Sequence, residues 1–331
     1  MAILDVCTGG SCTYTTIAAA ITAAAATDII ELRGDITENV ALNKNVAEIR
    51  GDGNRTRTWT ATSGGGTNAT FKIQSGLNQA FTLRDLNVTK SGGVADCINL
   101  NTSGASQTLT FINCFIGVTI AGTDVLVNDI GVLNTGHVTL KQCDLSGDGS
   151  TGSTLWSGNS SNTTANSVRF ENTVFRSGNG LACNGSTANT VTEIYFCNID
   201  ANATGLILAH RAIIKDCIFT NNPTNDISLS GSGSKGDFSY CEFETQTDTG
   251  GFGTGNIFGI TSTNEYTDET TFDYHLKSGA QARGAGNSVS GITVDHDGVT
   301  RAATPDIGAF EFVAAATTAS PNSLMMMGVG I

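Results

Sequence analysis

The stretch TFINCFIG (residues 110–117) returns later in the chain as IIKDCIFT (residues 213–220). In both stretches a polar residue is followed by a cysteine, and apolar residues alternate with spacers on either side. Aligned on the apolar residue two places before the polar one, the copies of this motif begin at Leu83, Phe111, Leu140, Phe170, Ile194, Ile214 and Phe238. Repeats 20 to 30 residues apart are typical of solenoids, in which each unit buries its apolar face against its neighbours.

The phase of the motif indicates a bend within it. Leu109 and Phe111 alternate as in a strand with one buried face, and so do Cys114 and Ile116. The step of three residues from Phe111 to Cys114 would turn the second pair to the wrong face of a straight strand. A corner at Asn113 restores the phase, so that both pairs point into one interior.

The corner positions of the repeat are mostly short polar residues. They are Asp85, Asn113, Gln142, Asn172, Phe196, Asp216 and Tyr240. Asn and Asp tolerate the left-handed backbone conformation that a tight corner needs. Phe196 and Tyr240 depart from this pattern, and we expect their corners to be built differently. Strand, corner, strand and a variable return form one coil, so the sequence predicts an all-β parallel β-solenoid.

Five cysteines follow a corner and should form one column in the interior, where a buried free thiol acts as a small hydrophobe. They are Cys114, Cys143, Cys197, Cys217 and Cys241. Leu86 and Thr173 take this position in the other two copies. Disulfides between successive coils are the alternative, because strand spacing permits them. The odd total of nine cysteines fits reduced thiols better than a disulfide framework.

The charge of the chain excludes some partners. With 17 Lys and Arg against 30 Asp and Glu, the net charge is −13, which disfavours a nucleic-acid partner. A polyanionic polysaccharide is an awkward ligand unless a local basic patch or a bound cation intervenes. No apolar run reaches the length of about 18 residues that a transmembrane helix needs, and residues 1–16 lack the regions of a signal peptide. We therefore predict synthesis in the cytoplasm, no membrane partner and no cofactor.

The two ends of the repeat region carry a resemblance. Residues 14–53 begin with an alanine-rich stretch that predicts a short capping helix, with Thr15 or Thr16 as N-cap. This segment, with TENV (37–40) and IRGDG (49–53), resembles the start of the right-handed parallel β-helix superfamily, the pectate-lyase-like fold. Later stretches resemble the closing segment of such proteins, namely DYHLKSGAQARGAG (273–286), DHDGVTR (295–301) and PDIGAFEF (305–312).

This resemblance implies four parts. Residues 1–26 would form an N-terminal segment with the capping helix, residues 27–270 a right-handed parallel β-helix, residues 271–312 the closing segment, and residues 313–331 an apolar tail. Leu324, Met325, Met326 and Met327 lie in that tail, and we predict that they dock against another chain, because adaptable thioethers fill irregular pockets. The alternative is a tail that folds back along its own solenoid. CTGGSC (7–12) is a second contact or a small disulfide loop.

The residues directly before each corner point outward, where solenoid enzymes of the resembled class work. This outward row is Arg84, Ile112, Lys141, Glu171, Tyr195, Lys215 and Ser239. Lys141, Glu171, Tyr195 and Lys215 should stand on successive coils about 4.8 Å apart. If the chain is an enzyme, such a base, acid and phenol could abstract a sugar proton and protonate a leaving oxygen, as a lyase requires. The alternative is cross-strand ion pairing with a structural role.

Other candidate residues have simpler interpretations. His137 and His210 stand alone, and lone histidines are more often surface or satisfied core residues than catalysts. DHDG (295–298) lacks the further oxygen ligands of a calcium loop and is interpreted as a turn, with Arg301 and Asp306 available for pairing. The resemblance implies calcium-binding aspartates with an arginine base in pectate lyases, and three aspartates with a histidine in polygalacturonases. No stretch of this chain matches either set, and no metal site is predicted.

Three functions remain open. We predict a non-enzymatic structural protein of a phage virion, a capsid decoration (cement) protein or a tail component, which by resemblance to β-helical virion proteins would form a homotrimer and bind other virion proteins. The alternatives are a polysaccharide lyase or depolymerase and a glycan-binding, tailspike-like protein without catalysis. For the last, Trp156 or Trp59 would stack on a cell-surface sugar; Trp156 could also plug a neighbouring subunit.

Overall fold

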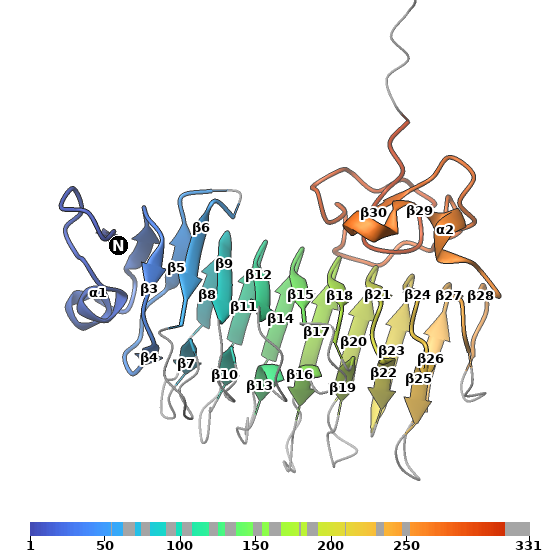
Figure 1. Cartoon of the computed structure of the whole chain (residues 1–331), viewed down its shortest axis with the longest axis horizontal. Helices are drawn as coiled ribbons and strands as arrows, with labels where there is room; N and C mark the ends of the chain where they lie inside the picture. Colours follow the sequence, from blue (N-terminus) through green and yellow to red (C-terminus); the bar gives the residue numbers. More distant parts are fainter. Residues whose placement is uncertain are drawn as a thin grey trace, which may run out of the picture.

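The computed structural model describes residues 1–314 apart from residues 54, 62–69, 74–79, 91–96, 101–107, 119–124, 130–136, 148–153, 159–166, 179, 184–190, 209, 230–234 and 247–251. The described chain is a parallel β-solenoid in which three long sheets run along one axis (Figure 1). The prediction of an all-β parallel β-helix is confirmed. Among these residues no helix has the length and apolarity to cross a bilayer.

Sheet A contains the first strand of each coil, and all its strands pair in parallel. Its order is β1 (Ile3–Val6), β2 (Ile29–Leu32), β5 (Glu48–Gly51), β8 (Ala80–Arg84), β11 (Thr108–Ile112), β14 (His137–Lys141), β17 (Ser167–Glu171), β20 (Val191–Tyr195), β23 (Arg211–Lys215) and β26 (Lys235–Ser239). The chain turns a corner directly after most of these strands and enters sheet B.

Sheets B and C complete each coil. Sheet B consists of β3 (Ile36–Thr37), β6 (Arg57–Thr60), β9 (Leu86–Lys90), β12 (Phe115–Val118), β15 (Asp144–Ser146), β18 (Val174–Arg176), β21 (Asn198–Asp200), β24 (Ile218–Thr220), β27 (Glu242–Phe243) and β28 (Ile257–Phe258). Sheet C consists of β4 (Val40–Leu42), β7 (Phe71–Ile73), β10 (Ile98–Leu100), β13 (Val125–Asp129), β16 (Thr154–Gly158), β19 (Leu181–Cys183), β22 (Thr204–Leu208) and β25 (Asn225–Leu229).

The corners between sheets A and B have the conformation that the motif predicts. All seven corner residues have φ between +49° and +57°. Phe196 and Tyr240 share this conformation, at +52° and +54°, so the expectation of differently built corners is wrong. A left-handed residue with a side chain costs roughly 1–2 kcal/mol. At Phe196 packing offsets this cost, because the ring is buried beneath the guanidinium of Arg301, 3.8 Å from its centre.

The interior is one apolar column that runs the length of the solenoid. The position after each corner is fully buried, and in two coils it holds Leu86 and Thr173. The cysteines in this position are free thiols, namely Cys114, Cys143, Cys197, Cys217 and Cys241. The alternative of disulfides between these coils is therefore not what the structure shows.

Both tryptophans belong to this interior. Trp156 lies on β16, is 1% exposed, and packs edge-to-face against Phe170 with 5.3 Å between ring centres. Trp59 is fully buried, and its indole N–H donates to the carbonyl of Glu38 over 2.8 Å. The expectation that Trp156 or Trp59 meets a sugar or a subunit is wrong, because both side chains fill the solenoid.

A short helix covers the N-terminal end of the solenoid, as predicted. Helix α1 (Ile17–Ala23) begins after Thr16, whose hydroxyl accepts from the amide of Ala19 over 3.2 Å. Ile17 and Ile21 are buried on one face against the first coil. Strand β1, before this helix, pairs with β2 as the outermost strand of sheet A, an element that the sequence did not suggest.

The closing segment is part of a larger C-terminal lobe, residues 260–312, which lies beside the sheet B corners near the C-terminal end (Figure 1). The lobe holds α2 (Ser262–Glu265), β29 (Tyr266–Asp268), the 3-10 turn η1 (Glu269–Thr271) and β30 (Asp273–Leu276). Its apolar residues, among them Tyr266 and Ile307, pack on Val174 and Ile218 of sheet B. Leu324, Met325, Met326 and Met327 lie outside the described residues, and their docking role stays a prediction.

Candidate functional site

The outward row lies on sheet A in the expected register. Arg84, Ile112 and Lys141 are paired across β8, β11 and β14. Glu171, Tyr195, Lys215 and Ser239 continue the row on the next strands. The structure therefore places the side chains suggested by the sequence side by side.

Most of their polar groups are used by one another. Glu171 is buried and receives the ammonium of Lys141 at 3.2 Å, and it also contacts the guanidinium of Arg169. Arg169 reaches Glu193 at 3.2 Å, and the Tyr195 hydroxyl donates to Glu193 over 3.2 Å. The Lys141–Glu171 and Arg169–Glu193 contacts are the cross-strand ion pairs of the structural alternative.

Tyr195 is closed off from solvent by the lobe. Its ring is 7% exposed and packs with Phe196 and Ile292. Burial, followed by the charge of Glu193, raises the pKa of Tyr195 to about 12. The phenol therefore remains protonated at neutral pH and cannot act as a base on a ligand there.

The lobe lies along the corners of the solenoid and forms hydrogen bonds with their side chains. The Asn172 amide donates to the carbonyl of Val294 over 2.8 Å, and its oxygen accepts from Arg301 over 2.7 Å. The Gln142 amide donates to the carbonyls of Asp295 and His296. Backbone carbonyls of the lobe thus satisfy the corner amides of these two coils.

Beyond Gln142 the corners are open and border a groove of about 570 Å³. Arg84 and Asp85 line it from one coil, and Ile112 and Asn113 from the next; the Asn113 amide donates to Asp85 over 2.7 Å. The remaining lining residues are Arg55, Gln142, His296 and Asp297. The solenoid and the lobe therefore share the walls of this corner groove.

A chain of charged contacts fixes the lobe side of the corner groove. His296 Nε2 lies 3.4 Å from Asp144 Oδ1, and Arg55 contacts the other oxygen of Asp144. His296 Nδ1 lies 3.1 Å from Asp297, whose second oxygen lies 2.8 Å from His275 Nε2. Although burial acts to lower it, the contacts with Asp144 and Asp297 raise the pKa of His296 to about 9.

The carboxylate of Asp297 lies between His275 and His296 and is the anionic centre of these contacts. Hydrogen bonds from His275 and then His296 hold the pKa of Asp297 well below its usual range. The bond to Asp297 raises the pKa of His275 to about 9, against a smaller opposing effect of burial. Both imidazoles are thus cationic at neutral pH. Arg84, 42% exposed at its side chain and paired with Glu48 at 3.0 Å, adds a cation at the opposite wall.

Sequence reasoning missed Arg55, His296 and Asp297. DHDG is a turn, as interpreted: the Asp295 carboxylate accepts from the amides of Asp297, Val299 and Glu311. The neighbouring His296 and Asp297 in this turn were the available signal. Asp144, the partner of His296, lies far from them in the sequence. Arg301 and Asp306 do not form an ion pair with each other. The Arg301 guanidinium binds the Glu311 carboxylate at 2.7 Å, and it contacts Asp306 through the backbone carbonyl of that residue.

The two lone histidines remain outside the corner groove. His137 is exposed, with Nδ1 2.5 Å from the Ser167 hydroxyl, and His210 is buried with Nε2 2.9 Å from the Thr192 hydroxyl. Within the described residues no group of three or more His, Cys, Asp or Glu side chains could hold a metal ion.

Comparison with known proteins identifies the fold. No protein-family model matches the chain, and no curated protein sequence does. The crystal structure of pectate lyase Pel9A is similar to it with a TM-score of 0.56 at 12% identity, covering 95% of this chain and 97% of that chain. Pectin methylesterases from carrot (18% identity, 78% and 89% covered) and Aspergillus niger (14%, 84% and 90% covered) match with TM-scores of 0.34. At this identity the Pel9A likeness shows a shared fold.

Proposed function

We propose that this chain is a polysaccharide-acting β-helix protein and that the corner groove binds the glycan. The supporting observation is the groove itself: in a chain of net charge −13, Arg55, Arg84 and His296 lie in the lining of one hollow, beside Asp85 and Asp297. Arg55 and His296 are paired with Asp144, so Arg84, whose side chain is 42% exposed, is the cation that an acidic sugar can reach. The shared fold with a pectate lyase is consistent with a polysaccharide ligand.

The chemistry of the walls suits a carbohydrate. Arg84 can donate a pair of hydrogen bonds to a carboxylate, while Asp85 and Asn113 offer an acceptor and an amide to hydroxyl groups. Ile112 between them supplies an apolar surface for the face of a sugar ring. Two neighbouring coils therefore present mixed polar and apolar contacts in one row.

Lys141 is the candidate for chemistry on the bound glycan. It directly precedes Gln142 of the groove wall, and its side chain is 42% exposed. Its ammonium, held by Glu171 at 3.2 Å, can donate a proton to a leaving oxygen, which is the acid step of a lyase reaction. Glu171 and Tyr195 are engaged in buried contacts, and Lys215 lies on the far side of them along the row. Of the four outward candidates, Lys141 is the one beside the groove.

The test compares variants for binding and cleavage on a panel of acidic and neutral polysaccharides. Arg84→Ala should weaken binding about 10- to 100-fold, the loss expected for a charge-assisted hydrogen bond. Arg33→Ala, an exposed arginine paired with Glu31 outside the groove, is the matched control and should bind normally. Wild-type protein that binds no member of the panel, or equal loss in both variants, would contradict the proposal.

Cleavage is followed by the ultraviolet absorbance of unsaturated chain ends. Lys141→Ala should abolish this signal and keep binding, whereas Lys215→Ala should leave both unchanged. A wild-type protein that binds glycan without releasing product would favour the non-catalytic alternative.

The virion interpretation has less support among the described residues. It rested on the lack of signal-peptide features, on reduced cysteines, on the absence of the family catalytic sets and on the apolar tail around Met326, which lies outside the described residues. A homotrimer, a virion location and the binding of other virion proteins stay predictions, and the tail is their test.

A further inference from the structure

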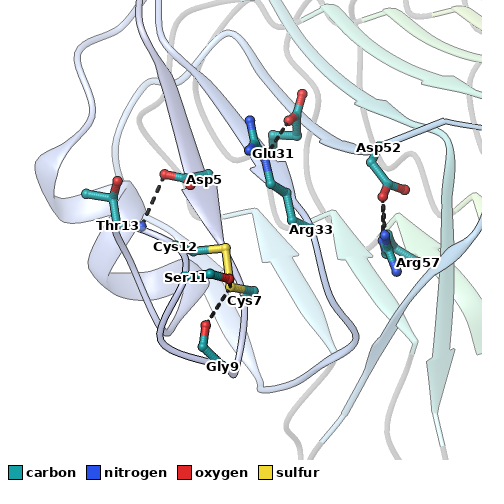
Figure 2. Close-up of a disulfide and its surroundings, with 10 residues drawn as sticks. All are labelled: Asp5, Cys7, Gly9, Ser11, Cys12, Thr13, Glu31, Arg33, Asp52 and Arg57. Atoms are coloured by element: carbon teal, nitrogen blue, oxygen red, sulfur yellow. Dashed lines mark hydrogen bonds and ion pairs between the residues drawn. A yellow bond between two sulfur atoms is a disulfide. The ribbon is translucent and has the colours of Figure 1, made fainter.

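The disulfide Cys7–Cys12 closes a small loop at the N-terminal end of the solenoid (Figure 2). Residues 8–11 of this loop are exposed, and Cys12 is partly exposed, whereas Cys7 is 7% exposed. A reductant in solution can therefore approach the sulfur of Cys12 from the loop side.

The loop returns the chain to the edge of sheet A. Tyr14 lies in parallel beside Val6, the Tyr14 amide donates to the carbonyl of Asp5, and the Cys7 amide donates to the carbonyl of Tyr14, both over 3.1 Å. The amide of Thr13 donates to the Asp5 carboxylate over 3.2 Å (Figure 2). Tyr14 thus covers backbone groups of β1 that face away from β2. Uncovered edge groups of this kind are templates for pairing with other strands.

The free cysteines of the described chain are shielded from the same chemistry. Those whose side chains the structure describes are fully buried in the solenoid: Cys97, Cys114, Cys143, Cys197, Cys217 and Cys241. Burial raises the pKa of the Cys143 and Cys217 thiols well above the ordinary value. Among the cysteines whose side chains are described, Cys7 and Cys12 are therefore the ones open to redox exchange with a solution thiol.

We propose that Cys7–Cys12 is a redox-cleavable clasp: a dithiol reduces it, residues 8–14 leave β1, and the edge of sheet A opens. A thiolate of the dithiol attacks Cys12 Sγ and the S–S bond breaks with Cys7 as leaving group. The second thiol of the reagent then displaces Cys12 and forms the reagent's own disulfide; its two protons end on Cys7 and Cys12.

The experiment treats native protein with dithiothreitol, alkylates it, and maps labels by mass spectrometry, with hydrogen exchange on the same samples. Reduction should label Cys7 and Cys12 while Cys114 and Cys143 need denaturant. Exchange of the Cys7 and Tyr14 amides should quicken at least tenfold, with β11 and β14 unchanged. The double variant Cys7→Ser/Cys12→Ser should show this exchange without reductant and no further change with it.

Two results would overturn the proposal. One is a disulfide that dithiothreitol reduces only when β11 and β14 also lose protection. The other is complete reduction that leaves the Cys7 and Tyr14 amides as protected as before. Both readouts use the wild-type protein, so they hold even if the double variant does not fold.

Discussion

Glu242 is an acid in a place built for apolar side chains. It is fully buried on β27, whose outer face meets the lobe, and neither carboxyl oxygen has a hydrogen-bond partner among the described residues. Burial, followed by the charge of Glu265, raises the pKa of Glu242 to about 9. Glu265 is equally buried, but the amides of Gln281 and Ala282 donate to its oxygens. The two carboxyl groups differ because only Glu265 has donors.

The free energy of unfolding that Glu242→Gln gains over the wild type should increase as pH rises. In the unfolded chain this acid ionises near its ordinary value, whereas in the folded chain it keeps its proton to about pH 9. Between the two values the folded state holds the extra proton, so the free energy of unfolding falls as pH increases. Gln cannot ionise, and the variant should gain on the order of 2 kcal/mol at neutral pH. Urea unfolding at about pH 5, 7 and 9 measures this difference.

Glu269→Gln is the control, because Glu269 lies on the neighbouring lobe, in the turn η1, which has no buried residues. Its free energy of unfolding should follow the wild-type pH dependence. If Glu242→Gln kept the wild-type slope as well, the carboxyl group of Glu242 would not be protonated in the folded protein.

Among the elements, the corners were predictable and the lobe contacts were not. The three-residue step in each motif determines the position of a left-handed residue such as Asn113, because the phase of the flanking strands requires it. No local pattern brings Gln142 to Asp295, which is 153 residues away. The groove needs such contacts, so the sequence placed Arg84 in the outward row but predicted neither the groove nor the position of His296 beside it. The burial of Trp156 was not predicted for a related reason: the polar residues around it concealed the strand pattern of the segment that carries it.

A single glycine tests how closely the lobe approaches sheet B. A Cβ on Gly308 would lie 2.7 Å from both Asn198 Oδ1 and Ile218 Cδ1, and its φ is +96°. Gly308→Ala should therefore push the lobe from the solenoid and lower the free energy of unfolding by about 2–4 kcal/mol, combining backbone strain with overpacking. Chemical denaturation measures the loss, and hydrogen exchange at β29 and β30 locates it.

Gly298→Ala separates the two causes. Gly298 has φ +84°, yet an added Cβ would meet nothing within 4 Å, so this variant should show the cost of strain alone. Equal losses in the two variants would mean that the contact between Gly308 and sheet B does not limit docking.

At the scale of the whole molecule, the lobe divides the row of corners along the solenoid into two groups with different contacts. From Gln142 to Asp216 the corners bind the lobe, and at Asp85 and Asn113 they face the groove. The repeat alone cannot make this distinction, because the corners have the same backbone conformation. The extent of the lobe therefore determines which corners remain open at the proposed glycan groove.

The end of the lobe also separates the folded body from the tail. Phe312 is held by its amide, which donates to Asp306 over 2.6 Å, and by the guanidinium of Arg283, 3.8 Å from its ring centre. A chain that ends at Phe312 should therefore keep the melting temperature and the glycan affinity of the full chain. If the tail docks against other chains, as its methionines predict, light scattering should show that this shortened chain has lost the oligomer that the full chain forms.

The full-length variant Met325→Ser/Met326→Ser/Met327→Ser distinguishes side-chain chemistry from tail length. It should lose the oligomer as the shortened chain does, because serine cannot fill an apolar pocket. An oligomer that survives both changes would assign assembly to the solenoid and leave the tail without a docking role. A lower melting temperature of the shortened chain would instead favour a tail that folds back along its own solenoid. Contacts within one chain contribute to its stability at any dilution.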